Sequence, residues 1–589
     1  MRNTSAGFVA VAVCCTLAFG QTDQATRATF LKVTFPARSD TVSVPRLRIA
    51  GGTLPTAKVT VNDQQVRVYP SGAFVHRVSL APGLNRVVIQ AEANGQRAAD
   101  TLSIYRIPPL QVSPSSPTQI DTSLVEPTVD MVLENGDLLR LRFKGSPGGS
   151  ARCSIEHLCK DLPMVELPPD EAEGMVGIYQ GVIRIKAERS LRPTPVRYEL
   201  RGVDGKKAKA ETKGTVSVLD SAVPLVAEVT SETPMWNAPQ GGAILWTLPA
   251  GLRVEVTGKI GGRYRARLSP QDVVWLNASD LRMLPLGTSV PRAVVSSMTC
   301  TVLDDRVQLV LDMTGRVPFR VEQSLQPAWL DVYLYGAHQG PQWLTYPEKQ
   351  VVIERVSWTQ PAEGVYRLRV ELNQRQQWGY SVSYGDRGLV LEVRRAPQIA
   401  KPPSSPVAGL TFVLDPGHGG DEPGAISPTG IMEKDVNLKW AKVLGSMLRS
   451  AGARVVLTRE DDRTLSLKER VLIAQQARGH IFVMMHNNSV GEGADPMVRG
   501  TSTYYTQPHS QDLAWTVYPR LRQIGLAGFG KIYSTYFITR QTDMLYFLVE
   551  GAFMSNPEDE MLLMNDSFIE QMAKAVFDGL EDFLRKQGQ

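Results

Sequence analysis

Four residues in the last third of the chain are of types that bind metal ions or move protons: His418, Glu433, His486 and Glu550. His418 lies in the glycine-rich stretch LDPGHGG, and Glu433 opens a run with the pattern of a helix. Two imidazoles and one carboxylate form a known ligand set for a catalytic zinc ion that keeps a fourth position open. A further carboxylate without a ligand role is what such chemistry needs for proton transfer.

The elements that must position these residues alternate between strand and helix. Short apolar strands are predicted at 411–415, 454–458, 480–485, 500–505 and 545–550, and helices at 436–452, 466–477, about 509–525 and 566–585. Such alternation predicts an α/β domain with an open, mostly parallel sheet flanked by helices. The functional groups of parallel sheets gather beyond the carboxyl ends of the strands, which is where His418, His486 and Glu550 stand.

The first of these helices has a clear apolar face. Its apolar residues recur at helical spacing and are Val436, Trp440, Val443, Leu444, Met447 and Leu448. Gly452 is expected to end the helix. The stretch GLAGFG at 525–530 is similar to a dinucleotide-binding fingerprint, but it follows a helix and is therefore predicted to be a turn.

Five ordered motifs within residues 410–586 resemble those of the type-3 family of zinc-dependent N-acetylmuramoyl-L-alanine amidases. The motifs are LDPGHGGDEPGAISPTGIMEKDVNL, VVLTREDD, LKERVLIAQQA, MMHNNS and FLVEGAFMSNPEDE. The resemblance implies that His418, Glu433 and His486 bind Zn²⁺ and that Glu550 is the catalytic glutamate. It also implies hydrolysis of the amide between N-acetylmuramic acid and the L-alanine of the peptidoglycan stem, in cell-wall remodelling or cell separation.

The chain departs from the family pattern at four positions near these motifs. Asn487 stands where alanine is common, Leu545 and Tyr546 replace a usual Pro-Ala pair, and Gln475 replaces an asparagine. None of these changes removes a ligand. Two alternatives therefore stay open: a catalytically inactive protein that binds peptidoglycan or regulates its turnover, and a zinc peptidase that acts on other amides.

Each site residue also has a plainer interpretation when it is taken alone. His418 could be a hydrogen-bonded turn residue, Glu433 a carboxylate stabilised by the helix dipole, and Glu550 a surface residue at a strand end. Their coincidence at one sheet edge favours a metal site. The other histidines lack such support and are interpreted as structural or solvated: His76, His157, His338, His480 and His509.

The chain before the α/β domain is predicted to be a series of all-β modules, because short strands with period-two patterning alternate with turn signals. The predicted order is an immunoglobulin-like sandwich at 25–107, a second β module at 120–220, an SH3-like module at 222–288 and an AMIN-like β module at 291–397. A Pro/Ser-rich linker at 398–409 leads to the catalytic domain at 410–589.

The N-terminus carries the pattern of a secretory signal peptide. Arg2 precedes an apolar run at 6–19 with small residues at its end, so residues 1–20 are expected to be removed. The run is shorter than the roughly 20 residues of a membrane span, and no stable span is predicted. We expect export to the periplasm or to the extracellular cell wall.

The net charge of +5 is small for a chain of 589 residues. It does not point to nucleic acid as a partner, because proteins that bind nucleic acid usually carry a concentrated basic stripe. The expected partner is peptidoglycan, with envelope proteins as candidate regulators.

Cys153, Cys159 and Cys300 remain after removal of the signal peptide. The stretch CSIEHLC offers Cys153, His157 and Cys159 as metal ligands, but it lacks a fourth ligand and the usual short spacings. An oxidising compartment favours a disulfide between the two cysteines. Cys300 is predicted to be buried.

Overall fold

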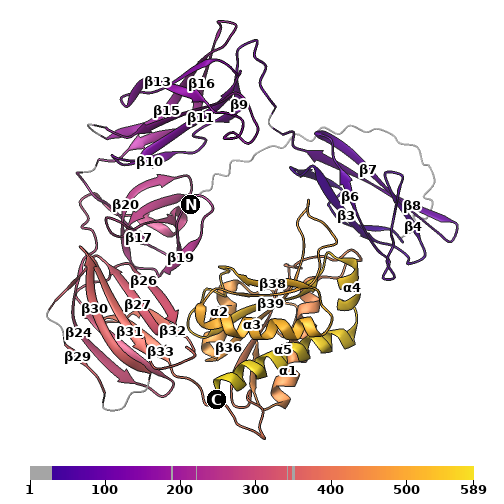
Figure 1. The fold of residues 1–589 in the computed structure, drawn as a ribbon, viewed down its shortest axis with the longest axis vertical. Coiled ribbons are helices and arrows are strands. Elements are labelled where there is room, and N and C mark those ends of the chain that lie inside the picture. Colours follow the sequence, from indigo (N-terminus) through magenta and orange to yellow (C-terminus); the bar gives the residue numbers. More distant parts are fainter. Residues whose placement is uncertain are drawn as a thin grey trace, which may run out of the picture.

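The computed structural model describes residues 30–588, except for 110, 188–189, 221, 341–342 and 348–351. The predicted signal peptide lies outside the described residues. Figure 1 shows four all-β modules followed by an α/β domain. The chain follows a curved path, so the first β module lies beside the α/β domain. The prediction of an all-β region followed by an α/β domain is confirmed.

The first β module consists of two sheets around one apolar core. Sheet β1-β3-β6 faces sheet β2-β8-β7-β4-β5. Two-residue turns with positive φ angles, Asn62-Asp63 and Asn94-Gly95, close two of its hairpins, as their residue types favour. The strands are β1 (Lys32–Phe35), β2 (Ser39–Val42), β3 (Arg46–Gly52), β4 (Lys58–Val61), β5 (Gln64–Val66), β6 (Ala73–Ser79), β7 (Gly83–Ala93) and β8 (Gln96–Arg106).

The second β module comprises β9 (Ile120–Val125), β10 (Met131–Leu133), β11 (Leu138–Gly145), β12 (Ser150–Ile155), β13 (Cys159–Glu166), β14 (Ile178–Arg184), β15 (Leu191–Arg201) and β16 (Lys207–Val218). The third comprises β17 (Leu225–Val229), β18 (Thr233–Trp236), β19 (Ile244–Leu248), β20 (Arg253–Ile260), β21 (Arg263–Arg267), β22 (Val273–Asn277), a 3-10 helix (Ala278–Asp280) and β23 (Leu281–Met283). Strand β10 joins the two modules, because it pairs with β16 on one side and with β20 on the other. The guanidinium of Arg265 reinforces this junction with two bonds of 2.7 Å to the Asp137 carboxylate.

The fourth β module packs a sheet β28-β24-β25-β33-β32, with β29 beside β24, against a sheet β26-β27-β31-β30. Its apolar core is continuous with that of the third module, and Trp246 of β19 contacts Phe319 of β26 across the boundary. Its strands are β24 (Ala293–Val302), β25 (Arg306–Met313), β26 (Phe319–Leu325), β27 (Ala328–Tyr335), β28 (Ala337–Gln339), β29 (Leu344–Thr345), β30 (Ile353–Ala362), β31 (Val365–Leu372), β32 (Tyr380–Tyr384) and β33 (Gly388–Arg394).

The α/β domain is built on one sheet with the strand order β35-β34-β36-β39-β37-β38. All neighbouring strands in it are parallel except β37 and β39. Its strands are β34 (Thr411–Pro416), β35 (Arg454–Leu457), β36 (Ile481–Asn488), β37 (Thr501–Tyr505), β38 (Gly528–Tyr533) and β39 (Leu545–Phe553). Its helices are α1 (Glu433–Ser450), α2 (Leu467–Gln476), α3 (Pro508–Gln523), α4 (Pro557–Leu563) and α5 (Asp566–Gln587).

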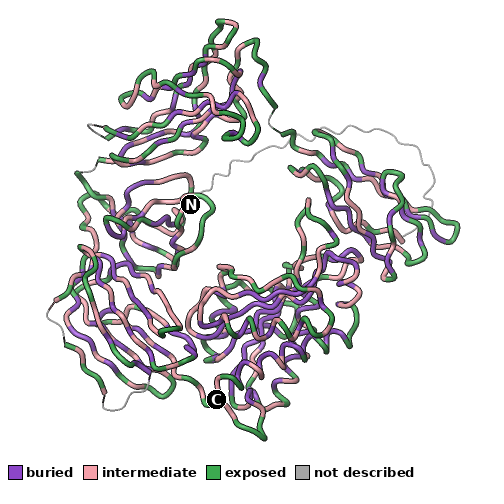
Figure 2. Tube along the Cα trace, viewed as in Figure 1, coloured by how far each residue is buried: buried purple, intermediate pink, exposed green. Residues whose placement is uncertain are grey.

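Helices cover both faces of this sheet. Helices α1, α3 and α5 share one apolar core with the sheet, whereas α2 packs on the opposite face in a second core. The predicted apolar face of α1 is confirmed: Trp440 and Leu444 are fully buried, and Val443 and Met447 pack against the same core. Because both faces are covered, the central strands are buried along almost their whole length, in contrast to the alternating strands of the β modules (Figure 2).

Two local predictions do not hold. The turn predicted at 525–530 is partly wrong, because Gly528–Gly530 open edge strand β38, whose pairing with β37 contains a bulge at this point. The disulfide favoured for Cys153 and Cys159 is not formed, and both are free thiols. The register of the β12–β13 hairpin sets Cys159 opposite Ile155 and Cys153 opposite Leu162, so the two cysteines are not cross-strand partners. The burial of Cys300 is confirmed.

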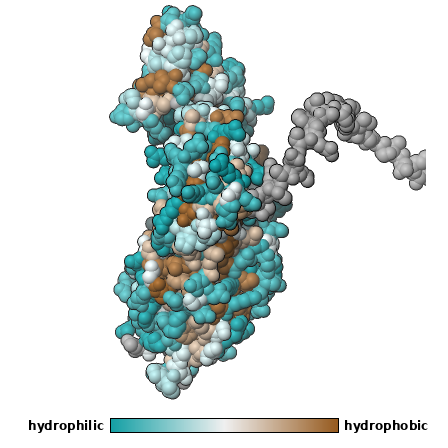
Figure 3. Space-filling view, turned by 90° about the vertical axis from the view of Figure 1, so that its right-hand side faces the viewer, coloured by the Kyte–Doolittle hydropathy of each residue, from teal (hydrophilic) through white to brown (hydrophobic). Residues whose placement is uncertain are grey.

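None of the helices within the described residues is long and apolar enough to cross a membrane. On the face seen in Figure 3, hydrophobic residues gather mostly in the lower half, and smaller patches interrupt the hydrophilic surface above.

Candidate metal centre

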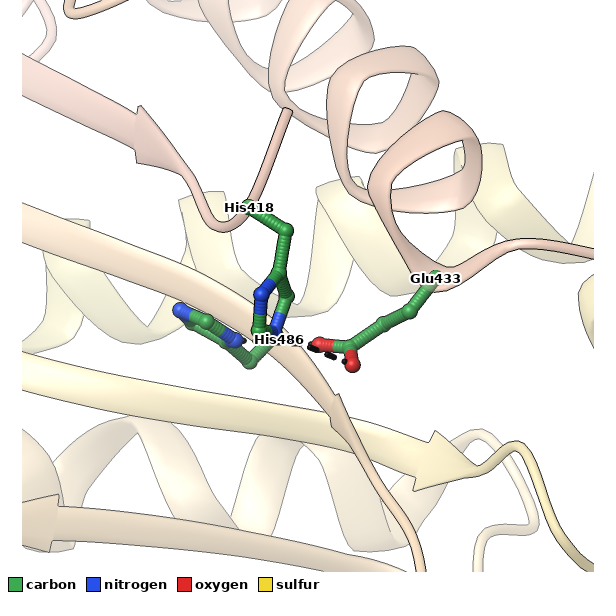
Figure 4. Close-up of side chains that lie close together, drawn as sticks. All are labelled: His418, Glu433 and His486. Atoms are coloured by element: carbon green, nitrogen blue, oxygen red, sulfur yellow. Dashed lines mark hydrogen bonds and ion pairs between the residues drawn. The ribbon is translucent and has the colours of Figure 1, made fainter. Parts of the chain in front are cut away.

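His418, Glu433 and His486 come from three different elements and meet at the carboxyl edge of the sheet. His418 follows β34, Glu433 is the first residue of α1, and His486 lies near the end of β36. Their ligand atoms all lie within 4.8 Å of one another, and they are the one such group of three among the described residues. Figure 4 shows the Glu433 carboxylate directed toward the two imidazole rings, which lie next to each other. Cys153, His157 and Cys159 do not form a comparable group.

The carboxylate of Glu433 holds both rings. Its Oε2 lies 3.2 Å from His418 Nε2, and its Oε1 lies 3.0 Å from His486 Nδ1. Burial alone would raise the pKa of Glu433, but hydrogen bonds and charge from the two histidines outweigh it and hold the pKa well below its usual range. Nε2 of His486 is buried and has no hydrogen-bond partner, which is unusual for an imidazole nitrogen. Nδ1 is the ring nitrogen that faces Glu433, so an ion shared by the three residues would be held by His418 Nε2, the Glu433 carboxylate and His486 Nδ1.

Two glycines in the loop around His418 allow the ligands to approach one another. A Cβ atom at Gly417 would lie 2.0 Å from His486 Nε2. A Cβ atom at Gly424 would lie 2.5 Å from Glu433 Oε2, and this residue also has a φ of +68°. The glycine-rich sequence is therefore required by close packing around the ligand atoms. His418 itself has a φ of +62°, which is uncommon for a residue with a side chain.

Glu550 lies in β39, directly opposite His486 in the register of the parallel pair β36–β39. Its Oε2 is buried and has no hydrogen-bond partner. Burial, followed by the negative charge of Glu433, raises the pKa of Glu550 well above its ordinary value. The structure thus brings Glu550 next to the three candidate ligands as a carboxyl group whose oxygen is not engaged by other side chains.

Two asparagines that the sequence reasoning did not assign to the site support Glu433. Asn437 Nδ2 donates to Glu433 Oε1 over 3.1 Å, and the backbone N–H of Asn487 donates to the same oxygen over 3.1 Å. The side chains of the two asparagines are joined by a bond of 2.9 Å. The signal for Asn437 was present in the sequence, because it stands four residues after Glu433 and so lies on the same helical face.

Two buried arginines fix the loop that carries His418. Arg470 donates to the Asp415 carboxylate over 2.6 Å and to the His418 carbonyl over 2.8 Å. Arg459 donates to the carbonyls of Pro416 and Gly417 over 2.9 and 3.0 Å. Both arginines belong to motifs of the family resemblance, but nothing in their spacing predicted that they hold backbone carbonyls rather than substrate.

The departures from the family pattern lie in two different places. Asn487 is at the site, where its Oδ1 accepts the N–H of Ala552 over 3.1 Å. Tyr546 lies toward the other edge of the sheet and donates its hydroxyl to Asp543 over 2.9 Å, and Gln475 interacts with the same carboxyl group. Leu545 is fully buried in the core. Only one of the four changes therefore touches the candidate ligands.

An open α/β sheet that carries a His/Glu/His donor set and a spare carboxyl at its carboxyl edge defines a candidate metal-dependent hydrolase. Comparison with known families agrees with this class. Residues 412–582 match the family described as N-acetylmuramoyl-L-alanine amidase. The match identifies the α/β domain as a domain of that family, and the β modules lie outside the matched residues.

Three known proteins illustrate the similarity. The chain is 33% identical over 183 residues to "Probable cell wall amidase LytH" of Staphylococcus epidermidis, covering 31% of this chain and 60% of that protein. It is 33% identical over 193 residues to N-acetylmuramoyl-L-alanine amidase LytC of Bacillus subtilis, covering 32% of this chain and 38% of that protein. The solved structure of N-acetylmuramoyl-L-alanine amidase AmiC2 of Nostoc punctiforme is 34% identical, covers 30% of this chain and 99% of that chain, and gives a TM-score of 0.29. The chain thus spans less than two thirds of the length of the two sequence relatives.

Proposed function

We propose that the α/β domain is a zinc-dependent N-acetylmuramoyl-L-alanine amidase that cleaves peptidoglycan between N-acetylmuramic acid and L-alanine. The observation that carries this proposal is the convergence of three donor residues, His418, Glu433 and His486, beside Glu550 at the carboxyl edge. Their ligand atoms lie within 4.8 Å of one another, and the buried Oε2 of Glu550 in the neighbouring strand lacks a hydrogen-bond partner. Buried polar atoms are rarely left in this state unless a ligand completes them.

The donor set fits zinc in its chemistry. His418, Glu433 and His486 would hold the ion, and three protein ligands are the number that leaves a catalytic position open. Asn437 and the N–H of Asn487 would orient Glu433, as outer partners of a ligand carboxylate do. A zinc ion bound there would polarise the substrate carbonyl and lower the pKa of a water molecule.

Glu550 is the residue to which we assign proton transfer. Its carboxylate would accept a proton from the attacking water and deliver it to the departing amide nitrogen, which is a poor leaving group until it is protonated. A raised pKa suits this exchange, because a general acid–base works best when its pKa lies near the working pH. Glu550 needs a free oxygen for this role, and its Oε2 is free of protein partners.

We assign the four β modules to support and to recognition of the wall polymer, with the Ig-like, SH3-like and AMIN-like interpretations and their boundaries as predicted from the sequence. The exported location, in the periplasm or the extracellular cell wall, belongs to the same proposal, as do envelope proteins as candidate regulators. One of the two sequence relatives is named a probable cell wall amidase, which supports the proposed location.

To test the proposed amidase activity, the protein is incubated with intact peptidoglycan in the presence of added zinc or of a chelator. The released peptides are identified by mass. We expect stem peptides that begin with a free L-alanine amine, and we expect their loss with the chelator and in Glu550→Gln. Bound zinc without released peptide would support the inactive binding or regulatory protein instead. Peptides cut at other amides would support the zinc peptidase.

A further inference from the structure

The first β module is docked on the α/β domain. Strand residues alternate between two faces, so Leu47 and Ile49 of β3 enter the core of the module and Arg48 and Ala50 face away from it. Arg48 and Ala50 are nevertheless only 4% and 1% exposed. The outer face of sheet β1-β3-β6 is therefore covered, and Figure 1 shows this module beside α4 and the loops of the α/β domain.

One group of contacts reaches the loop 419–432, which connects His418 to Glu433. Thr34 Oγ1 donates to the Pro428 carbonyl over 3.1 Å. Thr429 donates its N–H and its hydroxyl to Glu560 Oε1 of α4 over 2.9 and 2.7 Å. Ser71 of the first β module lies 3.5 Å from the other oxygen of Glu560. The tip of this loop is thus held between the module and α4.

A second group of contacts reaches the loop 489–500, which follows His486 along the chain. The Arg48 N–H donates to the Glu492 carbonyl over 2.9 Å, and Arg77 Nη2 donates to the Gly493 carbonyl over 3.0 Å. The hydroxyl of Tyr69 lies 3.6 Å from Met497 Sδ. A Cβ atom at Gly493 would lie only 2.9 Å from Val44 Cγ1, so the loop and the module are in close contact.

Both loops are directly connected to the candidate ligands. The N–H of Ala425, in the first loop, donates to Glu433 Oε2 over 2.9 Å, and the Glu433 N–H returns a bond of 2.9 Å to the Ala425 carbonyl. The second loop runs from the strand that carries His486 to Thr501, whose hydroxyl donates to the Glu550 carbonyl over 2.9 Å. A displacement of either loop therefore moves groups that orient the site.

We propose that the first β module is a positioning part of the active site, because it holds the loops 419–432 and 489–500 in the conformation in which the three ligands converge. It is then held against the α/β domain and is not a freely tethered module. The inference rests on the proposed function only for its effect on turnover, because loop order and metal affinity are measured without substrate.

The test compares two glycine variants in one loop of the full chain. Gly493→Gln places a side chain against Val44, whereas Gly491→Gln points into open space and is the matched control. We expect amide hydrogen exchange in both loops to be about tenfold faster in Gly493→Gln than in the control. The dissociation constant for zinc should rise about tenfold as well, as for loss of outer support around a ligand.

A second pair of variants changes residues of the first β module instead of residues of the loop. Thr34→Val removes the hydroxyl that donates to Pro428, and Thr41→Val removes an exposed hydroxyl of β2 for comparison. We expect faster exchange in 419–432 for Thr34→Val alone.

If Gly493→Gln matches Gly491→Gln in exchange and in zinc affinity, the proposal is overturned. If the effects appear but no wild-type protein releases stem peptides, the proposed function fails and the positioning role stands.

Discussion

Strand β36 carries a histidine near each end, and the two histidines differ in how their ring nitrogens are used. His480, just before the strand, accepts the N–H of Thr411 at Nδ1 over 2.9 Å. His486, near the carboxyl end, has a buried Nε2 without a partner. His509 lies, like His480, near the amino ends of the parallel strands, here called the amino edge. Its two ring nitrogens are hydrogen-bonded to Gln323 and to the Met544 carbonyl. The comparison teaches that the structural histidines bond to backbone groups or to an amide, whereas His486 shares a buried carboxylate with a second histidine, which marks it as a candidate ligand.

Two carboxyl groups, Asp543 at the amino edge and Glu550 at the carboxyl edge, also differ in whether protein groups engage them. Asp543, just before β39, has a raised pKa because it is buried, but Tyr546 and Gln475 engage it. Glu550, at the other end of the same strand, also has a raised pKa and keeps a free oxygen. The amino edge is therefore built for stability, whereas the carboxyl edge keeps polar atoms available.

The largest expected effect is on turnover, from the carboxyl groups of Glu550 in β39 and of Asp543 just before it. Glu550→Gln should lower the rate of stem-peptide release about a thousandfold or more, within the range of general acid–base catalysis, and should retain bound zinc. Asp543→Asn is the matched change at the opposite edge and should leave the rate within about threefold, because it touches no reacting group. Release rates and zinc content of both variants check this. Equal losses in the two variants would remove the distinction between the edges.

The next effect is on metal affinity, from His486 in β36 and His480 just before it. His486→Ala should weaken zinc binding at least about a hundredfold, because a ligand itself is removed. His480→Ala should leave zinc affinity unchanged and should lower stability instead, because it leaves the N–H of Thr411 without its acceptor. Zinc titration and urea unfolding of the two variants separate these outcomes. A loss of zinc in His480→Ala would contradict the assignment.

A third effect concerns pH and the amino edge. Burial lowers the pKa of His509 and that of His480 to about 4 each. The unfolded chain then binds more protons than the folded chain between about pH 6.5 and pH 4, so stability is present above this range and is lost as the pH falls through it. Each histidine should account for about 2 kcal/mol of loss between pH 8 and pH 5.

His509→Gln should remove its own share of this pH dependence and leave that of His480. Tryptophan fluorescence follows the transition in urea at each pH, and Trp378, which is buried against Phe583 of α5, contributes to this signal. An unchanged slope in His509→Gln would show that this histidine is not protonated on unfolding.

The smallest effect is expected from outer amides at the two edges. Asn437→Ala should weaken zinc binding about tenfold, because Glu433 loses one of the donors that orient it. Gln475→Ala removes a side-chain amide near Asp543 and should leave zinc affinity unchanged. Zinc dissociation constants measured side by side check the pair.

Much of the site was predictable because its signals are local. His418, Glu433, His486 and Glu550 each stand at a strand end or helix start, and the topology of a parallel sheet brings such positions together. Asn437 was readable in principle from its helical spacing to Glu433. The two arginines that hold the His418 loop were not, because their bonds go to backbone carbonyls of distant residues.

The all-β character of the first part of the chain and the α/β character of the last were also predictable, whereas the way the modules join was not. Period-two patterns reveal strands, but they do not show that β10 connects two modules into one ladder or that Thr34 meets Pro428. The predicted disulfide between Cys153 and Cys159 was wrong for a related reason. The register between two strands depends on turn and pairing geometry, which the spacing of two cysteines alone does not set.

The bond between Thr34 and Pro428 joins residues 394 positions apart, and this separation has a consequence for folding. Contacts between distant segments form late, because the chain must first lose the entropy of closing the loop between them. The three β modules that lie between these two residues can form from local pairings before that closure. We therefore expect the chain to fold module by module and to reach a competent site last, when its earliest ordered segment meets its final domain.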